Sequence, residues 1–236
     1  FSGCGGGSDS TEVRGRIGMT CMDLTNPFFK LIANVMTEEA AKHGYDVTAL
    51  SGELDPAKQN SQMSDFVAQG YDAIFLNPVD SRSAGEGVRA AHEAGIPVFT
   101  FDIQVQDEEA AALVASHLGS DNFQGGELAG ASMMKALGNE GKVAVLGLPE
   151  VSSCILRVEG FKKALKDAGS PIEIVTELNG KGSRDVGYTV ATDILQAHPD
   201  IRGIFAINDP SALGAHAAVV KAGKQTRLRW WLSMLL

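Results

Sequence analysis

Short apolar runs alternate with longer amphipathic stretches along most of the chain. The first half has predicted strands over 16–22, 46–52, 73–78 and 97–103, and predicted helices over 27–43, 56–69 and 83–94. These strands are continuous apolar runs rather than alternating ones, as expected where both faces of a sheet are covered. A strand and a helix recur about every 25 residues, which predicts βαβ units and a parallel sheet.

The alternation weakens in an acidic segment over 104–111 and then restarts. After a short strand near 112–118, predicted helices over 123–137, 153–168, 184–197 and 210–222 alternate with strands over 142–148, 172–179 and 203–209. We therefore expect an N-terminal α/β lobe over 14–119 and a C-terminal α/β lobe over 120–224. The second lobe shows three clear strands against at least four in the first, so we interpret it as incomplete.

Composition is that of an ordinary globular protein. Of 236 residues, 44% are hydrophobic and 21% are charged, which excludes disordered, collagenous and coiled-coil classes. The formal net charge of -9 argues against nucleic acid as a partner, because a phosphate backbone attracts basic proteins. No apolar run reaches the roughly 18 residues that a membrane-spanning helix needs.

The chain opens with Phe-Ser-Gly-Cys, which is similar to the lipobox of bacterial lipoproteins. In a lipobox, small residues before the cysteine suit the signal peptidase, and the thiol, here that of Cys4, takes the lipid. A Gly-rich run follows, so we interpret residues 1–13 as a lipidation site and a flexible tether. The alternative is a disordered terminus or the remnant of an engineered fusion.

The other two cysteines, Cys21 and Cys154, belong to no CxxC pair, and no Cys/His cluster has metal-ligand spacing. We expect both to be small buried residues, with a disulfide between them as the alternative.

Polar and aromatic residues follow the predicted strands. In open α/β sheets, ligands bind outside the carboxyl ends of parallel strands, where the loops converge. The residues at those ends are Asp23, Thr25, Asn26, Pro27, Phe28, Phe29, Asn77, Pro78, Asp80, Asp102, Gln104, Glu150, Ser152, Ser153, Arg157, Asn208 and Asp209. Carboxylates, carboxamides and a guanidinium beside aromatic rings suit a neutral polyhydroxylated ligand.

Each candidate also has a structural explanation. Asn26 and Asn208 are typical helix caps, and Asp102 suits a turn. Phe28 and Phe29 are typical core residues. Adjacent helix positions face different directions, so the two rings cannot both pack in the same core.

Arg157 has a structural explanation of its own, which is a surface ion pair with Glu150 or Glu159. The interpretation as a binding site therefore depends on the joint placement of these residues.

No enzyme signature is present in the sequence. The segment 138–143 is only partly similar to a P-loop, since it precedes its strand and has Val where Ser or Thr is required. GxGxxG does not follow the first strand, neither GxSxG nor HExxH occurs, and the five histidines are scattered. We therefore expect no catalytic residues, no metal and no cofactor.

Five segments together resemble the type I periplasmic sugar-binding proteins, and in particular ribose-binding-protein-like solute receptors of ABC transporters. These segments are NPFF at 26–29, FD at 101–102, SDNFQGGELAG at 120–130, RVEGF at 157–161 and AHPDIRGIFAINDPSALGA at 197–215. The resemblance extends over roughly 14–224, and its motifs occur in the family's order.

The resemblance implies two Rossmann-like lobes joined by a hinge, with a monosaccharide or polyol enclosed between them. Asn26, Phe28, Phe29 and Asp102 would be first-lobe contacts, with one or both rings stacking on the sugar. Two residues, Arg157 and Asn208, would close from the second lobe, and Gln104 is a further candidate from its place after the fourth strand. The implied protein is a monomer of the periplasm or cell envelope that delivers its ligand to an ABC permease in the inner membrane.

Three departures from the ribose receptors put ribose itself in doubt. Ile103 stands where they have Arg, the segment 180–184 lacks their second stacking Phe, and Met22 replaces a small polar residue. A different pentose, a hexose, a deoxysugar or a polyol therefore stays open as the ligand.

Three other functions compete with sugar import. The effector domain of a LacI-type regulator shares the fold, but it would follow a helix-turn-helix rather than a lipobox-like cysteine. A chemotaxis or quorum-signal receptor would differ only in ligand and partner, and an α/β enzyme has no catalytic constellation to support it.

The tail over 225–236 departs from the acidic, Trp-free sequence before it, since it reads QTRLRWWLSMLL and holds both tryptophans. The family continues here with a buried strand of the type (D/E)IxVVGFD. One codon choice for 226–236, shifted by one base, encodes Glu-Ile-Ala-Val-Val-Ala-Phe-Asp-Ala-Ala, which has that pattern. We therefore interpret the tail as frameshifted, with a genuine terminal strand as the alternative, and the DNA sequence decides between them.

Overall fold

A computed structural model describes residues 13–224 and 229–232 of the chain, with the backbone alone described for the second range. Contacts within the chain divide it into two compact units. Unit 1 comprises the chain up to Val79 together with Ser83–Phe101 and Asp107–His117. Unit 2 comprises Asp80–Arg82, Asp102–Gln106 and the chain from Leu118 onward, so it includes the short segments that follow β3 and β4.

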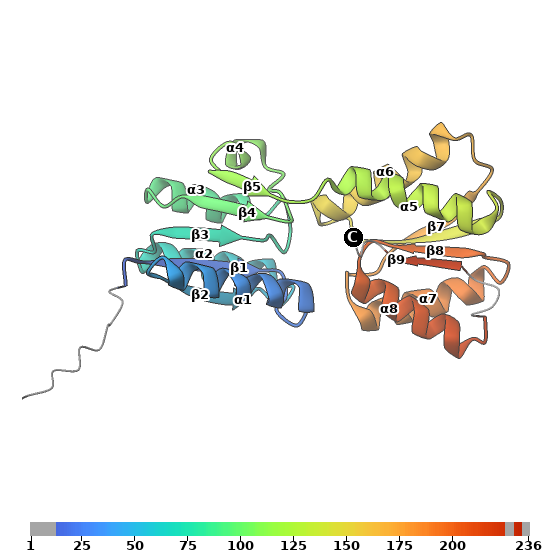
Figure 1. Ribbon diagram of the computed structural model, residues 1–236, viewed down its shortest axis with the longest axis horizontal. Helices are drawn as coiled ribbons and strands as arrows, with labels where there is room; N and C mark the ends of the chain where they lie inside the picture. The colour runs from blue at the N-terminus through green and yellow to red at the C-terminus, as the bar shows by residue number, and fades with distance from the viewer. Residues whose placement is uncertain (1–12, 225–228, 233–236) are drawn as a thin grey trace, which may run out of the picture. The chain divides into compact units, whose positions relative to one another are not determined.

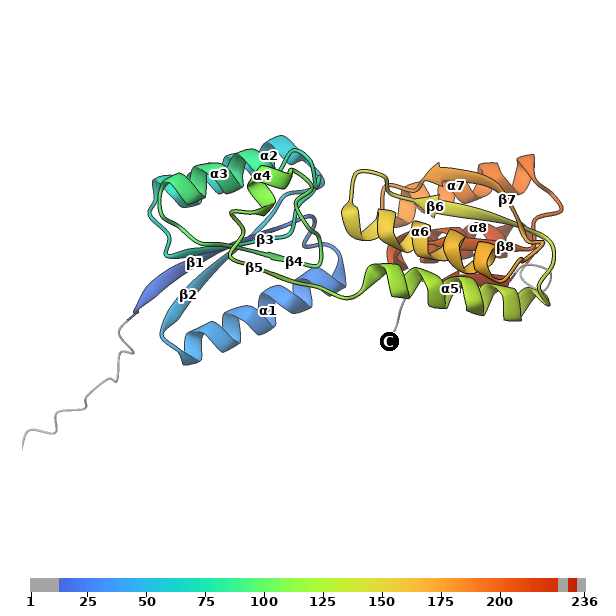
Figure 2. The same ribbon diagram turned by 90° about the horizontal axis from the view of Figure 1, so that it is seen from above.

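Unit 1 is a five-stranded sheet with helices on both faces. Its strands are β1 (Gly15–Cys21), β2 (Tyr45–Ser51), β3 (Ala73–Leu76), β4 (Val98–Phe101) and β5 (Ser116–Leu118), in the order β2-β1-β3-β4-β5. The pairs β1–β2, β1–β3 and β3–β4 are parallel. Figure 2 shows α1 (Pro27–Lys42) on one face of this sheet and α2 (Pro56–Ala68) and α3 (Gly85–Glu93) on the other. A short helix, α4 (Glu108–Ala111), lies in the acidic segment for which no helix was predicted.

Unit 2 is a four-stranded parallel sheet with a pair of helices on each face. Its strands are β6 (Lys142–Gly147), β7 (Glu173–Asn179), β8 (Gly203–Ala206) and β9 (Arg229–Leu232), in the order β7-β6-β8-β9. One face carries α5 (Asn122–Leu137) and α6 (Ser152–Asp167), and the other carries α7 (Arg184–Ala197) and α8 (Asp209–Lys221) (Figure 1). Two sets of parallel strands flanked by helices confirm the predicted α/β fold class.

The helix starts follow from local sequence chemistry. Asn26 accepts a hydrogen bond from the backbone N–H of Phe28, and Pro27 occupies the first turn, where its missing N–H costs nothing.

The end of α1 was also predicted correctly, because Gly44 adopts a φ of 81° that other residues rarely reach. The predicted strand over 203–209 was too long: β8 ends at Ala206, because Asn208 turns the chain into α8.

Reciprocal glycine contacts bring the two helices of each unit 2 pair close together. A Cβ atom on Gly126 of α5 would lie 2.1 Å from the carbonyl oxygen of Arg157, and one on Gly160 of α6 would lie 2.0 Å from that of Phe123. The second pair repeats this arrangement, since a Cβ on Gly214 of α8 would lie 2.1 Å from the carbonyl oxygen of Arg184. Such approaches are possible only without side chains, so the glycines fix the backbone of Arg157 against α5.

Beneath these helices lies the apolar core of unit 2. Phe161 of α6 stacks on Phe205 of β8 with ring centroids 4.5 Å apart, and both rings are fully buried.

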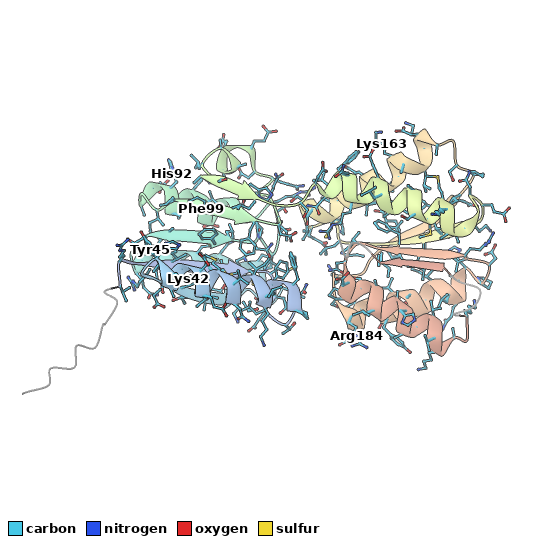
Figure 3. The ribbon with its side chains drawn as sticks, in the orientation of Figure 1. Lys42, Tyr45, His92, Phe99, Lys163 and Arg184 are labelled. Carbon is cyan, nitrogen blue, oxygen red and sulfur yellow. The ribbon has the colours of Figure 1, made fainter. Side chains whose placement is uncertain are left out.

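Charged side chains lie on the outer surfaces, as Figure 3 shows for Lys163 on α6 and Arg184 at the start of α7. Among the described residues, no helix is long and apolar enough to cross a membrane.

The tail provides the edge strand of unit 2. β9 pairs in parallel with β8, with Trp230 opposite Ile204 and Trp231 opposite Phe205. A strand at this place is expected for a genuine terminal strand, and the shifted frame also encodes an apolar strand here. The frameshift thus stays a prediction, and residues 225–228 and 233–236 lie outside the described residues.

Candidate functional site

Arg157 is held at the end of β8 by two hydrogen bonds. Its Nε donates to Asn122 Oδ1 of α5 at 2.9 Å, and its Nη1 donates to the carbonyl oxygen of Ile207 at 2.8 Å. The side chain is only 14% exposed. The alternative of a surface ion pair is wrong, because Arg157 reaches inward across the end of the sheet.

Glu150, the proposed surface partner of Arg157, has other partners. It accepts hydrogen bonds from Asn179 Nδ2 at 2.9 and 3.1 Å and forms an ion pair with Lys181 at 3.0 Å. These contacts tie together the ends of β6 and β7 and give Glu150 a structural role.

Asp102 lies across from the Arg157 guanidinium. Its Oδ1 is 3.9 Å from Arg157 Nη2, which is an ion pair but too long for a hydrogen bond, and the side chain is 17% exposed. Its backbone has a φ of 58°, a left-handed conformation that Asp tolerates at turns and that costs conformational energy elsewhere. Asp102 is thus a turn residue, as the structural explanation predicted, and its carboxylate also faces the guanidinium.

Asn208 caps α8 and links it to the neighbouring loop. Its Oδ1 accepts from the backbone N–H of Ser211 at 3.1 Å, and its Nδ2 donates to the carbonyl oxygen of Gly182 at 3.0 Å. The predicted capping role is confirmed. An Asn amide has four hydrogen-bonding positions, so the side chain keeps capacity beyond these two bonds.

Asp209 follows directly and begins α8. Burial raises the pKa of its carboxyl, an effect that the nearby Arg157 guanidinium partly offsets. Within unit 2, Arg157 of α6 thus faces both Asp102, which follows β4, and Asp209 in the turn that leaves β8. Asp102 was expected as a first-lobe contact, but the segment that holds it belongs to unit 2.

Phe28 and Phe29 in unit 1 have opposite environments. Phe29 is 4% exposed and packs in the core, whereas Phe28 is 53% exposed at the start of α1. Their rings meet edge to face with centroids 5.3 Å apart. Of the two predicted stacking residues, only Phe28 therefore offers a ring face to a ligand, and Asn26 beside it caps the helix.

The sequence did not reveal a buried polar network at the strand ends of unit 1. Asn77 accepts from the backbone N–H of Met22 at 3.1 Å and donates to the carbonyl oxygen of Phe101 at 3.1 Å, so it joins the ends of β1, β3 and β4. Gln59 donates to the Asn77 carbonyl oxygen at 2.9 Å and accepts from the Val79 N–H at 2.7 Å.

A second glutamine of α2, Gln62, extends this network. Its Oε1 accepts from the Thr20 hydroxyl at 2.6 Å, and its Nε2 donates to the Ser51 carbonyl oxygen at 2.8 Å. Gln59 and Gln62 share the apolar face of α2 with Met63 and Phe66. Two amides on an apolar helix face are the signal that could have indicated the network.

Gln104 contacts the start of α6 through its backbone and not through its side chain. Its N–H donates to Ser152 Oγ at 3.0 Å, and the same hydroxyl donates to the Gln104 carbonyl oxygen at 3.2 Å, while the amide side chain is exposed. Ser81 belongs to the same contact, because its Oγ accepts from the Ser152 N–H at 3.0 Å. These bonds anchor the segments after β3 and β4 at the start of α6.

The structure shows the environment of the three positions at which the sequence departs from the ribose receptors. Ile103, in place of the expected Arg, is 1% exposed and belongs to the core, as does Met22. In the segment 180–184, the carbonyl oxygen of Gly182 accepts a hydrogen bond from Asn208 Nδ2. The guanidinium that the family resemblance implies after Asp102 is therefore missing, and a buried apolar side chain stands there.

Both described cysteines are free and buried, as predicted, so the disulfide alternative is wrong. Burial raises the pKa of Cys21 to about 12 and that of Cys154 to about 11, so neither is a reactive thiol. Within the described residues, no group of three or more His, Cys, Asp or Glu side chains is placed to hold a metal. Cys4 lies outside the described residues.

A cavity of about 310 Å³ lies beside α1 and does not coincide with the candidate residues. Its lining consists of Leu24, Lys30, Ala33, Asn34, Thr37 and Ala49. This wall offers only one charged group and no aromatic ring, so we assign no ligand to it.

Comparison with known proteins identifies relatives along most of the chain. Residues 17–229 match the family described as periplasmic binding protein domain. The chain is 38% identical over 209 residues to the ribose import binding protein RbsB of Bacillus subtilis, covering 88% of this chain and 66% of the relative. It is 35% identical to RbsB of Escherichia coli (92% and 72% covered) and 34% identical to the D-apiose import binding protein of Paraburkholderia graminis (85% and 63% covered).

Solved structures show the same fold. An ABC transporter periplasmic solute binding protein from Actinobacillus succinogenes with bound D-allose has a TM-score of 0.82 at 30% identity, with 92% of this chain and 77% of that chain covered. A solute binding protein from Agrobacterium vitis with bound D-fucose has a TM-score of 0.84 at 30% identity, with 92% and 75% covered. The chain spans about two thirds of the length of the curated relatives, and it belongs to the periplasmic binding protein domain family.

Proposed function

We propose that this chain is the sugar-binding receptor of an ABC importer, and that it binds a neutral monosaccharide or polyol. The observation that carries the proposal is the clamped Arg157 of unit 2, whose guanidinium faces the Asp102 carboxylate at 3.9 Å without a hydrogen bond between them. A guanidinium and a carboxylate at this spacing can each bond to one hydroxyl-rich ligand, the first as donor and the second as acceptor.

Unit 1 offers an aromatic surface of its own. The exposed Phe28 ring suits the C–H face of a sugar, and Asn26 lies two residues before it. In unit 2, the polar groups that suit sugar hydroxyls are those of Arg157, Asp102 and Asn208. Unit 2 corresponds mainly to the lobe proposed over 120–224, and unit 1 to the lobe over 14–119.

The hydrogen-bonding set differs from the one that the resemblance to ribose receptors implies. Ile103 replaces an expected guanidinium, and its side chain is buried in the core rather than offered to a ligand. The relatives whose names give ribose, apiose, allose, fucose and myo-inositol show that the same family accommodates several small polyols.

The biological setting follows from the same proposal. The receptor acts in the periplasm as a monomer without a cofactor, is anchored through Cys4, and delivers its ligand to an inner-membrane permease. It releases the ligand chemically unchanged, because binding rather than conversion is the activity named for its relatives.

A ligand screen by thermal shift tests this proposal. D-ribose, D-allose, D-apiose, D-fucose and myo-inositol are added singly to the purified chain, and the unfolding midpoint is recorded. A ligand at 100 times its Kd stabilises the folded state by about 2.7 kcal/mol, which raises the midpoint measurably. Chromatography of the released ligand checks that it is unchanged.

Variants then locate the site. Arg157→Ala and Asp102→Ala should each abolish the shift, because each removes one partner of the ligand's hydroxyls. Arg202→Ala and Asp185→Ala serve as controls, since Arg202 pairs with Glu140 on the surface and Asp185 is exposed on α7. A screen in which no sugar or polyol shifts the wild-type midpoint would refute the proposal, and equal shifts in all variants would refute the site.

A further inference from the structure

Asn179 at the end of β7 is the only asparagine of the chain that a glycine follows. In an Asn-Gly pair, the backbone nitrogen of the glycine can attack the side-chain carboxamide, because glycine has no Cβ atom to hinder the approach. The product is a cyclic imide, from which water forms aspartate or isoaspartate. The pair at 179–180 is therefore the place in this chain where spontaneous deamidation is chemically fastest.

Both reacting groups of this pair are held by hydrogen bonds in the folded chain. The N–H of Gly180 donates to the carbonyl oxygen of Gly147 in β6 at 2.9 Å. Asn179 Oδ1 accepts from the Lys181 N–H at 2.8 Å, and Asn179 Nδ2 donates to both carboxylate oxygens of Glu150 at 2.9 and 3.1 Å. Ring closure requires the Gly180 nitrogen to lose its proton and approach Cγ of Asn179, so these bonds must break first.

The loop after β7 adds further contacts that hold the strand end in place. Lys181 forms an ion pair with Glu150 at 3.0 Å. The carbonyl oxygen of Gly182 accepts from Asn208 Nδ2 at 3.0 Å. Opening of this strand end therefore breaks several bonds together, which is a local unfolding event with a free energy of its own.

We propose that Asn179 is a deamidation site that the fold protects, so that modification occurs only when the end of β7 opens from β6. In the reaction, the Gly180 nitrogen forms a bond to Asn179 Cγ and the Cγ–Nδ2 bond breaks, and ammonia leaves with the proton of the Gly180 nitrogen. Water then adds to one of the two imide carbonyl carbons, and the ring opens to aspartate or isoaspartate. The reaction needs water alone, so the site is independent of the proposed function.

The product places a like charge beside Glu150. Where Asn179 Nδ2 donates to that carboxylate, a second carboxylate oxygen would lie at about the same distance and repel it. Isoaspartate also lengthens the backbone before Gly180 by one methylene group, which shifts the N–H that bonds to Gly147. Both products should therefore loosen the ends of β6 and β7 and lower the stability of unit 2.

Peptide mapping by mass spectrometry tests the site itself. The purified chain is incubated at mildly alkaline pH, either folded in buffer or unfolded in urea, and aspartate and isoaspartate at position 179 are quantified over time. Modification should be at least about tenfold slower in the folded chain, because only the open fraction reacts. Equal rates in the two conditions would overturn the proposed protection.

Two variants separate the chemistry from the protection. Gly180→Ala should slow the reaction in urea about tenfold or more, because its methyl group hinders the attack. The fold accommodates this methyl group, since a Cβ atom there would lie no closer than 3.4 Å to the atoms packed around it. Glu150→Ala should instead speed the reaction of the folded chain, because it frees the Asn179 carboxamide. Glu177→Ala is the matched control, since it removes an exposed acidic side chain from the same strand, and it should leave the rate unchanged.

Asn179→Asp tests the consequence of the modification, because it has the charge of the product. Its unfolding midpoint at pH 7 should fall below that of wild type, and addition of Glu150→Gln should restore most of the loss, because the like charge is removed. Asn139→Asp is the control, since it adds the same charge at an exposed residue of the same unit and should change the midpoint little.

Three further results would overturn the inference. A wild-type rate for Gly180→Ala in urea would show that the carboxamide is lost without attack by the Gly180 nitrogen. An unchanged rate in folded Glu150→Ala, or an equal acceleration in Glu177→Ala, would show that the bonds to Glu150 do not protect the site. A wild-type midpoint in Asn179→Asp would show that the product does not disturb unit 2.

Discussion

The polar residues at the strand ends of unit 1 bond to one another, whereas in unit 2 one buried carboxylate oxygen, that of Asp209, has no partner among the described residues. In unit 1, Asn77 and Gln59 together satisfy the backbone at the ends of β1, β3 and β4. In unit 2, Asp209 Oδ1 has no partner among the described residues, and Arg157 Nη2 is 3.9 Å from Asp102. The strand ends of unit 1 thus have a structural role, whereas those of unit 2 keep the groups to which we assign the proposed ligand.

This difference separates stability from affinity. A buried amide network stabilises the fold because every removed partner leaves another group unpaired. A buried group without a partner reduces stability, because it has lost its bonds to water without replacement. Substitutions in the unit 1 network should therefore lower stability, whereas substitutions around Arg157 should lower affinity.

The largest expected effect is a difference in stability between substitutions at two adjacent residues of α1. Phe29→Ala should lower the free energy of unfolding by roughly 3 kcal/mol, because it leaves a cavity in the core of unit 1. Phe28→Ala should change it by less than about 0.5 kcal/mol, because its ring is half exposed, but should weaken sugar binding about 5- to 30-fold through loss of stacking. Urea denaturation and calorimetry measure the two quantities.

Each variant of this pair is the control for the other, since the two side chains are chemically identical. Equal losses of stability would contradict the separation of core and ligand ring. Unchanged affinity in Phe28→Ala would remove unit 1 from the proposed recognition and leave unit 2 alone.

Local chemistry in the sequence was sufficient to predict the order of strands and helices from β1 to α8, apart from the short helix α4. The cap at Asn26 and the stop at Gly44 depend on neighbouring residues, so their positions are predictable from a few letters. Arg157 and Asp102 were placed together from their strand-end positions and from the family resemblance. Strand-end position and family resemblance both indicate where a segment of the chain lies in the fold. Neither indicates which hydrogen bonds its side chains form.

Non-local packing explains what the sequence did not predict. The Gln59 and Gln62 bonds join residues up to 42 positions apart, so no local pattern determines them. The exposed and buried states of Phe28 and Phe29 depend on how α1 rests on its sheet. The unpaired Oδ1 of Asp209 is equally invisible in sequence, because lacking a partner is a property of everything packed around the atom.

A smaller effect is expected for the amide network. Gln59→Ala should lower the free energy of unfolding by roughly 2 kcal/mol, because the Val79 N–H and the Asn77 carbonyl oxygen each lose a buried partner. Sugar affinity should stay within about threefold of wild type. Gln69→Ala is the matched control, since Gln69 is exposed at the end of the same helix.

Hydrogen exchange detected by mass spectrometry locates the damage. Faster exchange in Gln59→Ala should be confined to β1, β3 and the loops that follow them. A loss of affinity larger than the loss of stability would contradict the structural role of this network and would bring Gln59 into the ligand site.

The smallest effect concerns acid sensitivity, in which the two units should behave alike. A hydrogen bond from Arg89 lowers the pKa of Asp107 in unit 1, and one from Lys142 lowers the pKa of Asp200 in unit 2. A lowered pKa means that the folded state binds the proton less readily than the unfolded state. Each pair therefore stabilises the fold above the ordinary Asp pKa of about 4, and this contribution is lost as the pH falls through the lowered value.

Asp107→Asn and Asp200→Asn should thus lower the unfolding midpoint at pH 7 but leave it close to wild type at pH 3. Asp65→Asn, an exposed position on α2, is the control and should show no such convergence. The effects should be small and should shrink further in 1 M salt, because both pairs are solvent-exposed and screened. A gap between wild type and variant that widens on acidification would contradict the sign of both shifts, and convergence for only one pair would show that the units differ in surface charge as well as at their strand ends.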